Sequence, residues 1–161
     1  MSRYGAQYGP DVTFLGVPPC DLGEPDTYAG ADVVILGAPF DGGTSHRPGT
    51  RFGPQAIRTT DYLGHDGSRP SLALRVDGLR DLRVLDAGDI MMPPGDIETS
   101  LGSLRQAVAA VCRAGAIPVV LGGDHSIAYA DASGVADIHG AGRASMIHFD
   151  AQADTGDVEF G

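Results

Sequence analysis

Two apolar segments of this chain end in side chains that could bind a metal ion. Residues 116–126 end in Asp124, His125 and Ser126, and residues 144–154 end in Asp150, Gln152 and Asp154. If the second segment is a strand, residues 150, 152 and 154 point to one face, because strand side chains alternate. Two carboxylates this close repel one another unless a cation or proton compensates. One imidazole plus carboxylates suits Mn²⁺, Fe²⁺ or Zn²⁺.

Each of these residues also has an ordinary structural explanation. Asp124 or Ser126 could cap the helix that follows them, and Asp150 and Asp154 could be solvated turn residues. We expect His148 to be a packed or hydrogen-bonded histidine rather than a ligand. The coincidence of an Asp-His turn and an Asp-x-x-x-Asp turn at two strand ends favours the metal-site interpretation.

The elements that would position these residues alternate between strands and helices. Apolar runs predict four strands, of which the first is expected to be buried on both faces. Apolar periodicity or helix-start signals predict three helices, and the second is expected to be capped by Asp96 and stopped by Gly115. We expect Gly134 to interrupt the third helix. The expected strands cover residues 31–41, 82–90, 116–126 and 144–154. The expected helices cover residues 53–63, an apolar stripe from Ile97 to Val111, and residues 127–140. This order predicts a three-layer α/β/α fold with a mostly parallel sheet, whose chemistry gathers at the carboxyl ends of the strands.

Composition excludes several classes of function. The formal charge of −10 argues against nucleic acid or an anionic membrane as partner and favours a cationic ligand. All 11 basic residues are arginine, which excludes a Schiff-base lysine and a P-loop lysine. We find no membrane-spanning run and no secretory signal. Cys20 and Cys112 fit no metal or redox spacing, which favours reduced thiols and a cytoplasmic location.

The motifs together resemble the ureohydrolases, the family of arginases, agmatinases and related guanidino-acid hydrolases. The strings that carry the resemblance are "GAPFDGGTSHRPGTRFGPQAIR" (37–58), "LDAGDI" (85–90), "LGGDHS" (121–126) and "HFDAQADTGD" (148–157). The resemblance implies a site with two Mn²⁺ ions that hydrolyses a guanidino compound to urea and an amine. By position it makes His125, Asp150 and Asp154 ligands of the first ion, with Asp150 bridging both.

The sequence departs from the family pattern at Gln152, where the family has a histidine that binds the second ion. An amide oxygen is a weak neutral ligand, so we expect weak binding of that ion. A second departure is length, because family members run to about twice this chain and carry further ligands, a proton shuttle and a substrate-binding glutamate in their later half. We therefore assign no catalytic residue and no substrate-binding residue within this chain.

The resemblance also sets expectations for organisation and substrate. We expect residues 1–30 to form an N-terminal arm and residues 31–161 to be the N-terminal portion of a single ureohydrolase domain, the C-terminal half being absent. Gly156 stands where arginases have an asparagine, which favours the agmatinase-like branch and agmatine, a guanidino acid or guanidine as substrate. The full-length form is expected to be a homo-oligomer, a trimer or hexamer.

Two alternatives remain open. The first is a catalytically inactive family member that acts as a structural or regulatory partner, which Gln152 and the short chain favour. The second is a different metal hydrolase that needs only His125, Asp150 and Asp154 for one ion.

Overall fold

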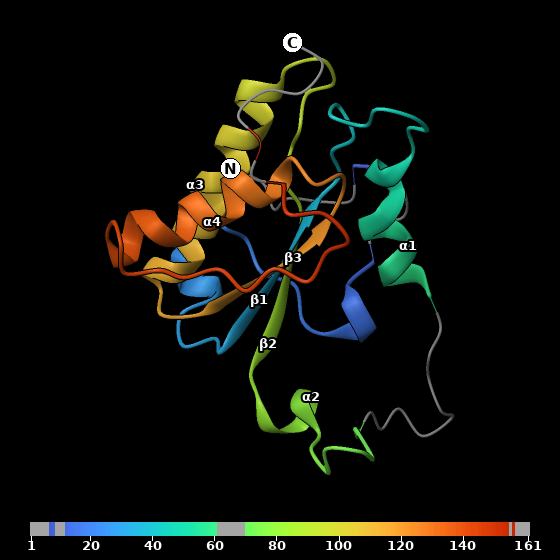
Figure 1. The fold of residues 1–161 in the computed structure, drawn as a ribbon. Coiled ribbons are helices and arrows are strands. Elements are labelled where there is room, and N and C mark those ends of the chain that lie inside the picture. The colour runs from blue at the N-terminus through green and yellow to red at the C-terminus, as the bar shows by residue number, and fades with distance from the viewer. Residues whose placement is uncertain (1–6, 9–11, 61–69, 155, 157–161) are drawn as a thin grey trace.

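The computed structural model describes residues 7–8, 12–60, 70–154 and 156. Its elements, in chain order, are η1 (Phe14–Gly16), η2 (Pro25–Thr27), β1 (Val33–Ala38), η3 (Thr50–Phe52), α1 (Gly53–Thr59), α2 (Gly78–Asp81), β2 (Val84–Asp89), α3 (Ile97–Arg113), β3 (Ile117–Gly122) and α4 (Ile127–His139). Figure 1 shows the strands at the centre, with α3 and α4 on one side and α1 on the other.

Three parallel strands form the sheet of the described residues, in the order β2-β1-β3. Val33 of β1 lies opposite Val84 of β2 and opposite Ile117 of β3. The central strand β1 is buried along nearly its whole length, which explains its continuous apolar sequence. These strands confirm the predictions for residues 31–41, 82–90 and 116–126, each somewhat shorter than expected.

Helix α3 covers one face of the sheet and supplies much of the core. Its residues Leu104, Val108 and Val111 are fully buried and share one cluster with Val34 and Leu36 of β1. The side chain of Asp96 accepts a hydrogen bond from the Thr99 amide (2.9 Å), so the predicted N-cap is present. Gly115, with φ +82°, follows the end of the helix as expected.

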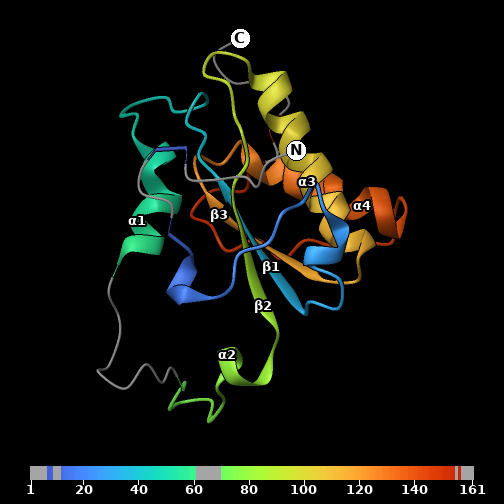
Figure 2. The ribbon, with the colours of Figure 1, turned by 180° about the vertical axis from the view of Figure 1, so that it is seen from behind.

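Helix α1 lies on the opposite side of the sheet, which completes three layers. The two views, related by a half-turn, agree on this placement (Figures 1 and 2). The helix begins at Gly53 with Pro54 in its first turn and ends at Thr59. The helix was expected to run to residue 63, but Thr60 is already extended (φ −73°, ψ 124°), and residues 61–63 lie outside the described residues.

Arg58 of α1 forms a buried ion-pair network with two carboxylates of β2. Its guanidinium donates to both oxygens of Asp86 (2.9 Å each) and also to Asp89. A bulge in β2, where Gly88 has φ +79°, turns both carboxylates toward α1 although they are three residues apart. Burial disfavours the charged guanidinium, but the hydrogen bonds and charges of Asp86 and Asp89 outweigh it and raise the pKa of Arg58.

The predicted fourth strand is wrong. Residues 144–154 form an irregular segment with no ladder, and Met146, Ile147 and Phe149 are exposed. A strand needs a neighbouring strand to pair its N–H and C=O groups. In the described part of the chain, this segment pairs with none of the strands of the sheet. Its apolar sequence alone could not hold it extended.

The expected interruption of the third helix is also wrong. Helix α4 runs without a break from Ile127 to His139, and Gly134 is buried in its middle. A Cβ at Gly134 would lie 2.7 Å from the carbonyl oxygen of Arg105 and 2.8 Å from Cβ of Val108. The missing side chain therefore serves close packing of α4 on α3. Among the described residues, no helix is long and apolar enough to cross a membrane.

Candidate metal centre

His125 lies in the tight turn between β3 and α4. The Asp124 amide donates to the carbonyl oxygen of Phe40 (2.8 Å), which ties this turn to the end of β1. The Asp124 carboxylate accepts from the amides of Gly43 (2.7 Å) and Ser126 (2.9 Å). Gly123 has φ +111°, and a Cβ there would meet the carbonyl oxygen of Ala38 at 2.5 Å. Asp124 therefore positions the turn, and His125 is left to point outward.

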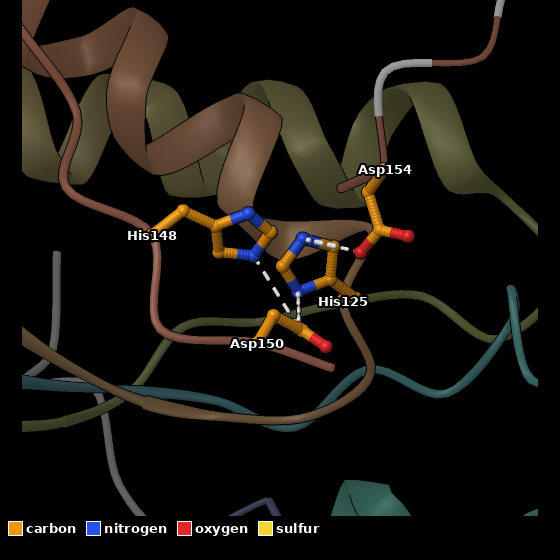
Figure 3. A group of neighbouring side chains, drawn as sticks. All are labelled: His125, His148, Asp150 and Asp154. Carbon is orange, nitrogen blue, oxygen red and sulfur yellow. Dashed lines mark ion pairs between the residues drawn. The ribbon is translucent and has the colours of Figure 1, made fainter. Parts of the chain in front are cut away.

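Four side chains meet beside this turn, as Figure 3 shows. Nε2 of His125 lies 3.2 Å from Oδ2 of Asp154, and its Nδ1 lies 3.8 Å from Oδ2 of Asp150. Nε2 of His148 lies 3.3 Å from the same Asp150 oxygen. The two imidazole rings stack, with centroids 5.1 Å apart and planes inclined by 24°. The irregular segment thus brings its imidazole and carboxylates to the end of β3.

Asp150 is the centre of this cluster and is held as a carboxylate. The Gln152 amide donates to its Oδ1 (3.2 Å). This bond is the main reason that the pKa of Asp150 lies below its usual value. The Ala151 amide and the charges of His148 and His125 lower the pKa further, whereas partial burial opposes the shift. This contact of Gln152 with the cluster is made by its main-chain amide.

The cluster has the donor set and spacing of a site for a divalent cation. One ligand atom from each of His125, His148, Asp150 and Asp154 lies within 4.8 Å of the others. Ligand bonds of about 2.0–2.2 Å place neighbouring ligands of one ion about 3–3.5 Å apart, close to the separations found here. The side chains are 26–50% exposed, so an ion could enter from solvent.

The structure brings together the three residues singled out from sequence, His125, Asp150 and Asp154. Their roles as metal ligands stay a prediction, as does any role of the Gln152 side chain. The structure agrees with the expectation that His148 is a packed or hydrogen-bonded histidine, because its ring stacks on His125 and its Nε2 lies 3.3 Å from Oδ2 of Asp150. The available signal was its spacing, because His148 lies two residues before Asp150 and so shares its face in any extended conformation.

A third polar strand end, Asp41 after β1, does not join the cluster. Its buried carboxylate accepts from Nε of Arg51 (2.8 Å) and from the Gly49 amide (2.8 Å). The Arg51 hydrogen bond is the main reason that the pKa of Asp41 lies below its usual value. The Arg51 guanidinium also lies over the Tyr8 ring, 5.7 Å from its centroid. Asp41 therefore orders the glycine-rich loop that packs behind the His125 turn.

Comparison with known proteins identifies relatives over most of the chain. The model of the arginase family matches residues 31–161. Proclavaminate amidinohydrolase of Streptomyces clavuligerus is 37% identical over 161 residues, which cover 99% of this chain and 48% of the relative. The mitochondrial agmatinase of Gallus gallus is 36% identical over 132 residues, covering 82% of this chain and 37% of the relative. The chain thus spans less than half the length of these relatives.

Solved structures show the same fold. The proclavaminate amidinohydrolase structure superposes with a TM-score of 0.68 at 35% identity, covering 83% of this chain and 42% of that one. A Trypanosoma cruzi formiminoglutamase crystallised with Mn²⁺ superposes with a TM-score of 0.58 at 33% identity, covering 67% of this chain and 36% of that one. These likenesses agree with the predicted α/β class and its parallel sheet.

Proposed function

Because this chain belongs to the arginase family, we propose that it contributes to the Mn²⁺-dependent hydrolysis of a guanidino compound to urea and an amine. The observation that carries the proposal is the meeting of His125, Asp150 and Asp154 at the carboxyl end of β3. The predicted branch is agmatinase-like, with agmatine or a related guanidino compound as substrate. Trimeric or hexameric assembly stays a prediction.

The residues of this chain would hold the metal and attract the substrate. His125 offers one nitrogen, and Asp150 and Asp154 offer carboxylate oxygens, a set that suits Mn²⁺. When bound, the metal supplies Lewis acidity that makes water a nucleophile at neutral pH. The two carboxylates and the formal charge of −10 favour approach of a cationic guanidinium. The fixed turn at Asp124 keeps His125 in place during turnover.

A second candidate function is a catalytically inactive partner of a related enzyme. Gln152 favours it, because an amide stands where the family has an imidazole for the second metal ion. An inactive partner would retain the fold and bind a full-length relative without releasing urea.

The test is urea release by the purified chain in saturating Mn²⁺, with agmatine, a guanidino acid and guanidine as separate substrates. The proposal expects urea from at least one of them, abolished in Asp150→Asn and enhanced in Gln152→His. A matched control is Asp137→Asn, which changes an exposed carboxylate of α4 outside the cluster. Absence of urea from the natural chain and from Gln152→His alike, with binding to a full-length relative retained, would establish the inactive-partner function instead.

A further inference from the structure

We propose that copies of this chain associate by placing an exposed apolar lobe of one copy in a groove between helices α3 and α4 of the next. The lobe comprises residues 70–83, which include α2. The groove is lined mainly by apolar residues of both helices, among them Ile97, Leu101 and Tyr129. This association needs neither metal nor substrate, so it lies beyond the proposed function, and it assigns two surfaces to the predicted homo-oligomer.

The lobe presents large apolar side chains to solvent. Leu72 is 86% exposed and Leu74 is 74% exposed, and Val76 and Leu82 are exposed as well. Leu72, Leu74 and Val76 alternate with smaller or charged residues, a spacing typical of a segment with one covered face. Their exposure shows that this face is not covered within one copy. Single apolar residues are ordinary on a protein surface, whereas a contiguous patch marks an interaction site.

Hydrogen bonds hold the exposed turn of the lobe in one conformation. The Ser71 amide donates to the carbonyl oxygen of Val76 (2.7 Å), and the Arg75 amide donates to the carbonyl oxygen of Ser71 (2.7 Å). The Leu74 amide donates to Oγ of Ser71 (3.3 Å). Arg75 has φ +55°, which is uncommon for a residue other than glycine. A turn that is already fixed in this way loses little conformational freedom when it binds a partner.

The groove between α3 and α4 is a hollow of matching chemistry. It has a volume of about 400 Å³ and is lined largely by apolar side chains. Each helix contributes one strongly exposed member, Ile97 from α3 and Tyr129 from α4, and Tyr129 is 72% exposed. Tyrosine is among the residues most enriched at the energetic centres of protein interfaces. The groove can therefore receive the leucines of the lobe.

The lobe and the groove lie at different ends of the molecule. Figures 1 and 2 both show α2 at one end of the sheet and the first turns of α3 at the other. The sheet separates them, so the contact joins two copies rather than two parts of one copy. A contact between two different surfaces is heterologous, and it generates a closed ring or an open chain of copies.

The charge of the lobe favours a second copy of this chain as its partner. Residues 70–83 carry three arginines and two aspartates, whereas the whole chain has a formal charge of −10. Arg80 pairs with the adjacent Asp81 (2.7 Å), and Arg83 donates to a main-chain carbonyl oxygen. Arg75 is exposed and forms no ion pair with another described residue. The lobe is thus a basic patch on an acidic chain, and it is attracted to acidic surfaces of other copies.

The groove carries the opposite charge. Of its two charged lining residues, Arg105 is paired with Asp137 (2.6 Å). Glu98 is exposed and forms no ion pair with another described residue. A lobe seated in the groove therefore brings the guanidinium of Arg75 toward the carboxylate of Glu98. Such complementarity fixes which surfaces meet and speeds their encounter.

The experiment follows association of the full chain by sedimentation velocity over a range of concentrations, at low and at high salt. We expect assemblies larger than one copy, which salt weakens by screening the opposite charges. A lobe variant, Leu72→Ser with Leu74→Ser, and a groove variant, Ile97→Ser with Tyr129→Ser, should each raise the dissociation constant about tenfold or more. A natural chain that sediments as a single copy at every concentration would overturn the proposal.

Mixing the two variants tests whether the lobe of one copy meets the groove of another. Each variant alone should be dissociated, but each retains one intact surface. The mixture should therefore form a complex of one lobe variant with one groove variant. A mixture that stays dissociated while the natural chain associates would overturn the pairing of these two surfaces.

Exchanging the two charges tests the choice of partner. Arg75→Glu and Glu98→Arg each place like charges at the contact and should weaken association, and a chain that carries both changes should recover it. Association that is unchanged in both single variants, or not recovered in the double variant, would overturn the match between the two surfaces.

A matched control separates these surfaces from apolar exposure in general. Met91 is 61% exposed but belongs to neither surface, so Met91→Ser should associate like the natural chain. Equal weakening by Met91→Ser would overturn the assignment of the surfaces. Circular dichroism melts of each variant show whether the fold is retained.

The outcomes distinguish this inference from the proposed function. A natural chain that releases urea but stays a single copy would overturn the inference and leave the proposed function standing. A chain that associates through the lobe and the groove without releasing urea from any guanidino substrate would support the inference and contradict the proposed function.

Discussion

Replacing Arg58 by Met should strongly destabilise the fold. Arg58 is the cation of a buried network, and its side chain is 1% exposed. The change leaves the carboxylates of Asp86 and Asp89, 0% and 2% exposed, without a cation and without their guanidinium hydrogen bonds. A Cβ at Gly37 would come within 1.9 Å of Asp89, so the carboxylate already fills the space left by that glycine and has little room to turn away.

The expected magnitude follows from the cost of an unpaired buried charge. Removing one partner of a buried ion pair costs about 3–5 kcal/mol of unfolding free energy. For a chain of this size, each kcal/mol lowers the melting temperature by about 2–4 °C. Arg58→Met should therefore lower the melting temperature by roughly 6–20 °C, with α1 losing its attachment to β2.

The assay is thermal unfolding followed by far-ultraviolet circular dichroism at pH 7. Arg105→Met is the matched control, because Arg105 forms a similar bidentate pair with Asp137 at 2.6 Å but both side chains are 40–45% exposed. Water screens such a pair, so the control should melt almost like the natural chain. Equal melting temperatures for Arg58→Met and Arg105→Met would refute the reasoning that burial makes the Arg58 network important.

Three further predictions concern the Asp41 loop, the α3–α4 contact and the second metal position. Arg51→Met should lower the melting temperature most at pH 6–7 and progressively less below about pH 4, because the depressed pKa of Asp41 contributes stability that is lost as the pH falls. Gly134→Ala should lower the melting temperature, since overpacking costs about 1–3 kcal/mol, and the new Cβ would meet the Arg105 carbonyl at 2.7 Å. Gln152→His should add a second bound Mn²⁺ and increase urea release, because an imidazole replaces a weak amide ligand.

Each of these has a contradicting result. A difference between Arg51→Met and the natural chain that grows on acidification would mean that Asp41 is not the group involved. A Gly134→Ala chain of unchanged or higher melting temperature would show that helix propensity outweighs the contact. Identical Mn²⁺ stoichiometry and urea release in Gln152→His would show that the identity of residue 152 does not limit the site.

Local sequence signals were sufficient to predict the elements whose first and last residues are marked in the sequence. Helix α3 follows its apolar stripe, its Asp96 cap and the glycine after it, as expected. The strands β1, β2 and β3 follow their apolar runs because β1 pairs with both β2 and β3. Residues 144–154 have the same kind of sequence but no strand neighbour, and pairing partners are not encoded locally. The short helix α2 was not predicted, since its four residues give no periodic pattern.

The candidate site was likewise predictable from spacing in part, whereas some of its contacts depend on other segments of the chain. The strand-end rule placed His125, Asp150 and Asp154 near one another, and the structure brings them together. Asp41 also lies at a strand end, but its partners Arg51 and Gly49 come from the following loop and could not be chosen from spacing alone. The spacing of His148 placed it on the same face as Asp150 and Asp154, but spacing does not specify which atoms the imidazole contacts.

The most direct test of the account is anomalous X-ray diffraction from crystals of this chain grown with Mn²⁺. We predict a manganese peak coordinated by a nitrogen of His125 and by carboxylate oxygens of Asp150 and Asp154. A peak at another place, or no peak with these three side chains turned away from one another, would contradict the proposed function.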